Sequence, residues 1–106
     1  MANPKQNAFE AGLKKLMVAA RPEMMRRLHD VEKAVVTYSK GEFVEEAREL
    51  GHSQAHKLAG VLGTYGLTMG SRIAHQLEVA LEAEAEPDLD LMTAWIEELR
   101  QIISGK

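Results

Sequence analysis

Apolar residues recur every three or four positions along almost the whole chain, in five stretches that are separated by short breaks. This spacing places the apolar side chains of each stretch on one face of an α-helix. The stretches cover residues 7–20, 22–38, 42–65, 67–84 and a last segment that ends at about residue 104. No segment alternates apolar and polar residues for long enough to predict a β-strand. The pattern therefore predicts an all-α protein.

The breaks between these stretches contain residues that commonly begin or end helices. Pro22 is expected to end the first helix and to occupy the first turn of the second. Gly41 and Gly66 are expected to be left-handed C-terminal caps, and the Glu84–Asp90 segment is typical of a turn followed by an N-cap. Because the connections are short, neighbouring helices should be antiparallel. We expect an up-down four-helix bundle in which residues 7–20 form an additional N-terminal capping helix.

The composition narrows the classes of protein to which the chain can belong. Its 106 residues are enough for one domain, which we expect to span residues 1–106. The chain has no cysteine, which excludes disulfides and thiolate metal sites. A formal net charge of −3 lacks the basic excess that is typical of nucleic-acid-binding proteins. No apolar stretch is long enough to span a membrane or to form a secretory signal, so we expect a cytoplasmic protein. The oligomeric state is open from the sequence, and a monomer is the simplest expectation.

The third predicted helix, residues 42–65, places a histidine opposite its apolar face. On a helical wheel the apolar face consists of Val44, Ala47, Ala55, Leu58, Leu62 and Tyr65, and it is widened by Phe43, Leu50 and Val61. His56 lies nearly opposite the centre of this face, and Gly60 and Gly63 lie within about 40° of it. The exposed stripe therefore carries a histidine followed by two turns that have no side chain.

Two glycines on an exposed helical stripe require an explanation, because each destabilises a helix by roughly 0.5–1 kcal/mol relative to alanine. Here they leave room for another protein to approach the imidazole of His56. An exposed imidazole is a competent nucleophile near neutral pH. Phosphoryl transfer requires mainly in-line access and stabilisation of charge. An exposed imidazole in open surroundings, such as that of His56, is therefore suited to phosphoryl transfer.

The run from His56 to Gly66 resembles the signature of histidine-containing phosphotransfer (HPt) domains. The signature is a histidine, an apolar residue two positions later, a glycine four positions later and a small-aromatic-glycine ending, and the run reads HKLAGVLGTYG. It is most similar to the phosphotransfer domain of the chemotaxis histidine kinase. In that domain the next helix brings a histidine and a glutamate beside the phosphorylated histidine, at a spacing that matches His75 and Glu78. The resemblance implies that Glu78 accepts a hydrogen bond from one ring nitrogen of His56 and leaves the other nitrogen free to attack phosphate.

The resemblance also implies roles for the residues around this pair. His75 and Lys57 would be supporting polar groups, and Gly60 and Gly63 would give a partner access to the imidazole. Many members of the family carry a lysine where this chain has Ala59. The stabilisation of phosphate charge by this chain would therefore differ from theirs.

By the same resemblance, the chain would be a phosphorelay protein that exchanges a phosphoryl group with the aspartate of a response-regulator receiver domain or with a histidine kinase. It would be a phosphocarrier and not an enzyme, because the sequence has no nucleotide-binding glycine loop. It would bind no cofactor itself, since the receiver domain would supply Mg²⁺.

Two alternative functions remain open from the sequence. A non-catalytic interaction module of the same fold would bind receiver domains without phosphotransfer. A metal-binding bundle would use His52 and His56, which are four residues apart, with His75 or Glu78 as a third ligand. The two glycines would have no role in such a metal site.

Several other residues have simpler interpretations. Four methionines are expected to fill the core or its boundary, namely Met24, Met25, Met69 and Met92. Arg26 and Arg27 are expected on a solvated face, and Gly51 is expected where two helices pack closely.

Overall fold

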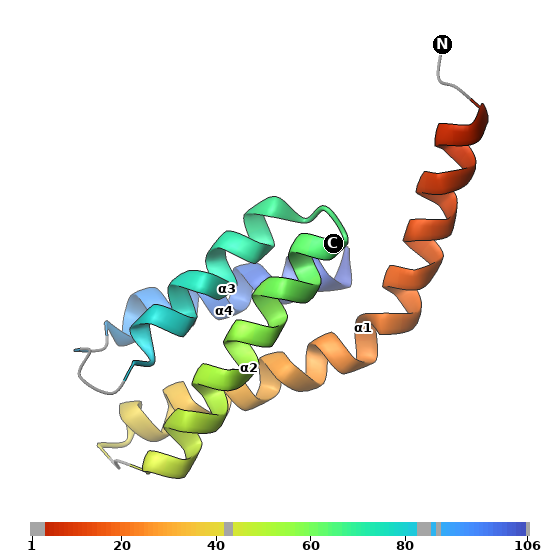
Figure 1. Ribbon diagram of the computed structural model, residues 1–106. Coiled ribbons are helices and arrows are strands. Elements are labelled where there is room, and N and C mark those ends of the chain that lie inside the picture. Colours follow the sequence, from red (N-terminus) through yellow and green to blue (C-terminus); the bar gives the residue numbers. More distant parts are fainter. Residues whose placement is uncertain (1–3, 42–43, 83–85, 87, 106) are drawn as a thin grey trace.

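The computed structural model describes residues 4–41, 44–82, 86 and 88–105, and within these ranges the chain forms four α-helices and no strand (Figure 1). The helices are α1 (Pro4–Ser39), α2 (Glu45–Thr64), α3 (Thr68–Ala80) and α4 (Leu89–Ser104). This confirms the prediction of an all-α protein. None of the helices in the described ranges is both long and apolar enough to cross a membrane.

The four helices enclose one apolar core. They contact one another in the closed order α1, α2, α3, α4 and back to α1, which is the arrangement of a four-helix bundle. The core residues are Met24, Leu28, Val31, Ala34 and Val35 of α1, Ala55, Leu58 and Leu62 of α2, Ile73, Ala74 and Leu77 of α3, Leu81, and Met92, Ile96, Leu99 and Ile103 of α4. Each large apolar side chain contributes about 1.5–3 kcal/mol when it is fully buried. This shared core fixes how α2 and α3 lie relative to each other.

The N-terminal part of the chain differs from the expectation of a separate capping helix. α1 is continuous through Pro22, so the predicted break between residues 20 and 22 is wrong. Proline removes one backbone N–H and crowds the carbonyl of Val18, which bends a helix without necessarily ending it. Figure 1 shows that α1 changes direction in this region and that its N-terminal part projects away from the other helices. We call residues 4–20 the arm.

The ends of α1 and α2 and the start of α4 carry the capping residues that the sequence predicts. The N–H of Leu67 donates to the carbonyl of Leu62 at 2.9 Å and that of Gly66 to Gly63 at 3.0 Å, the pattern of a Schellman motif. Gly66 has a φ of 76° and Gly41 a φ of 70°, which confirms both as left-handed. Asp88 begins α4, because its side chain accepts a hydrogen bond from the N–H of Leu91 at 3.1 Å. The connection expected over Glu84–Asp90 is described only at residue 86 and from residue 88 onward.

The buried stripe of α2 is shifted from the predicted one. It consists of Arg48, Gly51, Gln54, Ala55, Leu58 and Leu62. Val44 and Leu50 are 41% and 47% exposed, so their assignment to the core is wrong. Val44 precedes the helix and has extended backbone angles, so a helical wheel does not apply to it. Leu50 lies about 80° from Leu58 around the helix axis, outside the contact with α1 and α3. Phe43 lies outside the described residues.

Candidate functional site

His56 is on the outer side of α2 and is held by a carboxylate of α3. Its side chain is 75% exposed. Its Nδ1 atom lies 2.7 Å from Oε1 of Glu78 and 3.1 Å from Oε2 of the same carboxylate. The side chain of Glu78 is only 11% exposed. One ring nitrogen is therefore bound at the protein surface, and the imidazole is otherwise open to solvent.

The position of Glu78 follows from the amphipathic pattern of α3. Ile73, Ala74 and Leu77 face the core, and Glu78 comes next to Leu77 at the edge of this buried face. An edge position directs the side chain toward the neighbouring helix α2, where its carboxylate finds the imidazole as a partner. A buried carboxylate requires such a partner, because desolvation without one is costly. The hydrogen bond to His56 therefore also satisfies the buried acid.

The hydrogen bond determines which nitrogen of His56 is free. An ionised carboxylate accepts hydrogen bonds and donates none. Nδ1 must therefore carry the proton, and the neutral ring then has its lone pair on Nε2. This contact holds one nitrogen of the ring against α3, while the remainder of the imidazole is exposed.

His75 borders the same carboxylate but is not hydrogen-bonded to it. Its Nδ1 lies 3.9 Å from Oε2 of Glu78, and its side chain is 67% exposed. Lys57 is exposed and leaves α2 about 100° away from His56 around the helix axis. His52 is half-buried one turn before His56. Within the described ranges, no three His, Cys, Asp or Glu side chains are grouped so that they could hold a metal ion.

The two glycines that follow His56 have different surroundings. A Cβ atom at Gly60 would meet nothing within 4 Å, so the surface beside the imidazole is open there. A Cβ atom at Gly63 would lie 3.3 Å from Oγ of Ser71 on α3. The hydroxyl of Ser71 donates to the carbonyl of Ala59 at 2.7 Å and so ties α3 to α2. Gly63 is exposed, but it also lets the two helices approach closely.

On its other face α2 is fastened to α1 by a polar network that the sequence pattern does not reveal. Arg27 donates to Oε1 of Gln54 at 2.7 Å, and the amide of Gln54 donates to Asp30 at 2.7 Å. Gln54 is buried, and the side chain of Arg27 is only 20% exposed, so the expectation of a solvated face is wrong for Arg27. The partners are 24 and 27 residues apart, and no local periodicity connects them. The network fixes the helix that carries His56.

A buried cation lies near the beginning of α2. Arg48 is buried and donates to the carbonyl of Leu81 at 2.8 Å, just after the end of α3. It also pairs with Glu45 in the first turn of α2. This guanidinium lowers the pKa of Glu45 below its usual value of 4.5, mainly through the hydrogen bond. Arg48 therefore joins the start of α2 to the end of α3.

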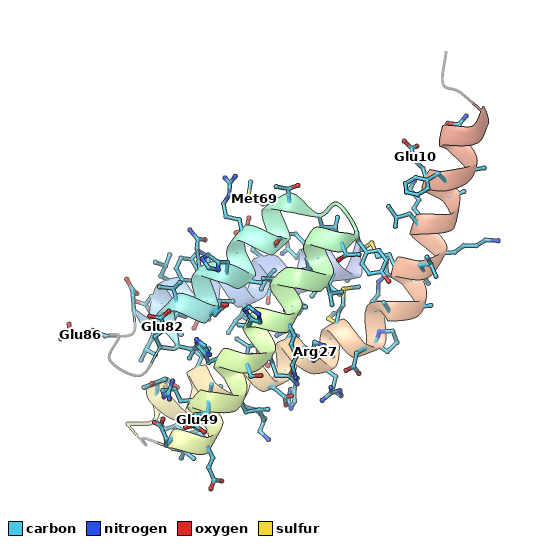
Figure 2. All side chains as sticks on the ribbon, in the orientation of Figure 1. Glu10, Arg27, Glu49, Met69, Glu82 and Glu86 are labelled. Carbon is cyan, nitrogen blue, oxygen red and sulfur yellow. The ribbon has the colours of Figure 1, made fainter. Side chains whose placement is uncertain are left out.

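Met69 is exposed, in contrast to the prediction that it fills the core or its boundary. It is 58% exposed, whereas Met24 and Met92 are buried and Met25 is half-buried. Figure 2 shows Met69 projecting from the first turn of α3. The buried face of α3 begins one residue later, at Gly70, where a Cβ atom would lie 3.2 Å from Ile102 of α4. Met69 therefore lies on the outer surface of α3.

Comparison with known protein families gives one match, which agrees with an exposed histidine on a helical bundle. A family model described as Hpt domain matches residues 15–105. No curated protein and no solved structure matches the chain.

Proposed function

The chain belongs to the Hpt domain family, the histidine-containing phosphotransfer domains of two-component signalling, and from this premise we propose that it carries a phosphoryl group on His56. Hpt domains are phosphotransfer modules that interact with receiver domains and histidine kinases. The observation that carries the assignment to His56 is its 2.7 Å contact with Glu78. Within the described part of the chain, His56 is the one histidine of four that combines an exposed ring, a hydrogen-bonded Nδ1 and a glycine one turn later.

In the proposed reaction, Nε2 of His56 attacks the phosphorus atom of an aspartyl phosphate in a receiver domain. A P–N bond forms as the P–O bond to the aspartate breaks, and the aspartate leaves as a carboxylate. No proton has to leave the ring, because Nδ1 keeps its proton throughout. The phosphorylated ring is cationic, and the carboxylate of Glu78 beside Nδ1 stabilises that charge. The reverse reaction passes the phosphoryl group to a receiver by the same contacts.

The partner supplies what this chain lacks for the transfer. A side chain at Gly60, one turn after His56, would meet no neighbouring atom. This open surface lets the active site of a receiver close over the imidazole. The receiver brings the Mg²⁺ and the cationic groups that stabilise the transferring phosphoryl group. Ala59 stands where many members have lysine, so the supporting polar groups proposed for this chain are Lys57 and His75. The chain then works as a phosphocarrier and not as an ATP-dependent kinase.

A labelling experiment tests the assignment. The protein is incubated with a phosphorylated receiver domain, and acid-labile, base-stable label is measured on the chain. We expect His56→Gln to lose all label, whereas the control variants His52→Gln and His75→Gln keep it. Label that persists in His56→Gln would place the phosphoryl group elsewhere. Receiver binding without label on the unmodified chain would favour a non-catalytic interaction module.

A further inference from the structure

A serine of α3 forms a hydrogen bond with the backbone of α2 near the His56–Glu78 pair. The hydroxyl of Ser71 donates to the carbonyl of Ala59 at 2.7 Å. A serine or threonine inside a helix commonly bonds a carbonyl in the preceding turn of its own helix instead. In the described ranges, the other serine and threonine hydroxyls that donate hydrogen bonds use a carbonyl three or four residues earlier in their own helix, and they are Thr37, Ser39, Thr64, Thr93 and Ser104. Ser71 therefore joins two helices, whereas these hydroxyls act within one.

Gly63 makes the acceptor of this hydrogen bond accessible. In an α-helix the carbonyl of Ala59 points toward residue 63 and accepts its N–H. A carbonyl oxygen has a second lone pair, and the hydroxyl of Ser71 donates to this oxygen. A Cβ atom at Gly63 would lie 3.3 Å from Oγ of Ser71, which is tighter than ordinary contact, so a side chain there would press on the hydroxyl. The absence of a side chain at Gly63 therefore accommodates the contact with Ser71.

The Ser71 contact and the His56–Glu78 contact lie along the same side of the α2–α3 pair. The two helices are antiparallel (Figure 1). Gly63 comes seven residues after His56 on α2, and Ser71 comes seven residues before Glu78 on α3. Seven residues are about two helical turns, so the two positions on each helix share a side and are about 10 Å apart along the axis. The two contacts are therefore in the same register, and a rotation of α3 that breaks one also displaces the other.

We propose that Ser71 is a positioning residue for phosphotransfer: its bond beside Gly63 fixes the rotation of α3 and so holds Glu78 at hydrogen-bond distance from His56. The apolar contacts of α3 with the core are not directional, whereas a hydrogen bond weakens steeply when its geometry departs from ideal. Nδ1 of His56 is 2.7 Å from Oε1 of Glu78, so a small rotation of α3 lengthens this contact. The role in transfer rests on the proposed function of His56, but the effect on the His56–Glu78 contact does not.

Nuclear magnetic resonance of the unphosphorylated chain tests the positioning. Ser71→Ala should shift the nitrogen-15 resonances of His56 toward those of Glu78→Ala, because the carboxylate holds the proton on Nδ1 less firmly. Thr64→Ala is the matched control, since the hydroxyl of Thr64 bonds the carbonyl of Gly60 within α2 at 3.0 Å, and it should match wild type. Identical resonances of His56 in Ser71→Ala and in wild type would overturn the proposal.

Two further replacements separate the hydroxyl of Ser71 from the bulk of its side chain. Threonine and valine are both branched at Cβ, but only threonine keeps the hydroxyl. Ser71→Thr should therefore stay close to wild type in the resonances of His56 and in transfer from a receiver. Ser71→Val should resemble Ser71→Ala, with transfer slowed about tenfold, the lower end of the effect of losing a group that supports a functional histidine. Equal effects of threonine and valine would show that the hydroxyl does not position Glu78.

A double-mutant cycle tests whether Gly63 serves the contact with Ser71. Gly63→Ala alone should displace the hydroxyl and shift the resonances of His56. In the Ser71→Ala background the same substitution should add nothing, because the new Cβ atom then lies 3.9 Å from Cβ of residue 71, an ordinary contact. Additive effects of the two substitutions would overturn the role assigned to Gly63.

These measurements distinguish failure of the positioning from failure of the proposed function. Label that persists in His56→Gln, together with shifted His56 resonances in Ser71→Ala, would contradict phosphotransfer on His56 while supporting the positioning of Glu78. Loss of label in His56→Gln, together with unshifted His56 resonances in Ser71→Ala, would support the proposed function and overturn the role of Ser71.

Discussion

Glycines lie on two opposite faces of α2, Gly51 on one and Gly60 on the other, and their surroundings differ. A Cβ atom at Gly51 would lie 2.7 Å from Cβ of Ala34 on α1, closer than real atoms approach, so glycine is required there for packing. A Cβ atom at Gly60 would meet no neighbour within 4 Å. One face of the helix is therefore closed by contact with α1, and the other is open beside His56. Substitution on the closed face should change stability, and substitution on the open face should change transfer.

The polar residues of the two faces show the same division. Gln54 is buried and uses both atoms of its amide in hydrogen bonds to Arg27 and Asp30. His56 is exposed and uses one ring nitrogen in its bond to Glu78. A side chain whose polar atoms are all engaged can only hold the structure, whereas one with an unengaged nitrogen can react. The difference lies in the neighbours and not in the polarity of the residues themselves.

The largest effect should come from placing a side chain at Gly51, where the neighbouring residues leave no room for one. Gly51→Leu forces a side chain against Ala34 and Leu81, and overpacking of this kind costs about 1–3 kcal/mol or more. We expect the free energy of unfolding, measured by urea denaturation, to fall by at least about 3 kcal/mol, because Cβ of Ala34 is attached directly to the backbone of α1. Gly60→Leu is the matched control and should not be destabilised. Equal stability of the two variants would remove the distinction between the faces.

Removing the acid that holds the imidazole should have the next largest effect. Glu78→Ala should slow phosphotransfer about 10- to 100-fold, the range found when a group that orients a functional histidine is lost. Nitrogen-15 chemical shifts of His56 should show the proton on Nδ1 in the wild type and no such preference in the variant. Glu82→Ala, one turn further and exposed, should match wild type in both measurements. An unchanged tautomer in Glu78→Ala would contradict the proposed role of the hydrogen bond.

Filling the open face should separate stability from transfer. Gly60→Ala should stabilise the bundle by about 0.4–1 kcal/mol, and Gly60→Leu should keep or raise the melting temperature because leucine favours helix. Gly60→Leu should slow transfer from a receiver about tenfold, equivalent to about 1.4 kcal/mol in the barrier, because the side chain obstructs docking. Phosphoramidate, a small donor, should still label His56. Normal transfer by a folded Gly60→Leu protein would show that this surface is not where the partner docks.

The smallest effect is expected at the start of α2, where Glu45 belongs to neither face. The pKa of Glu45 is lowered by Arg48, so the pair stabilises the fold above the usual pKa of 4.5. This contribution is lost as the pH falls below that value and through the lowered pKa of the folded state. The melting temperature of wild type should therefore decrease slightly more between pH 6 and pH 3 than that of Glu45→Gln. Parallel curves for the two proteins would show that the exposed pair contributes nothing measurable.

Local sequence patterns were sufficient to predict most of the helices and the residues at which they end. The periodicity of apolar residues predicted the helical segments, and the left-handed glycines at 41 and 66 followed from their positions after those segments. The same periodicity directed His56 away from the apolar face, and it is exposed in the structure. These features depend on residues within one or two turns of one another, and such short-range relations can be read directly from the sequence.

Contacts between distant residues decided the rest. The continuity of α1 through Pro22, the burial of Gln54 against Arg27 and the exposure of Met69 were not apparent from local spacing. By itself, the sequence determined an all-α chain with an outward histidine followed by two glycines. Only the tertiary structure decided that Gly51 packs while Gly60 is open, and that Glu78 reaches His56 across 22 residues of chain. The physical reason is that burial and hydrogen bonding depend on which surfaces meet, whereas helical periodicity reports only which side of a helix a residue occupies.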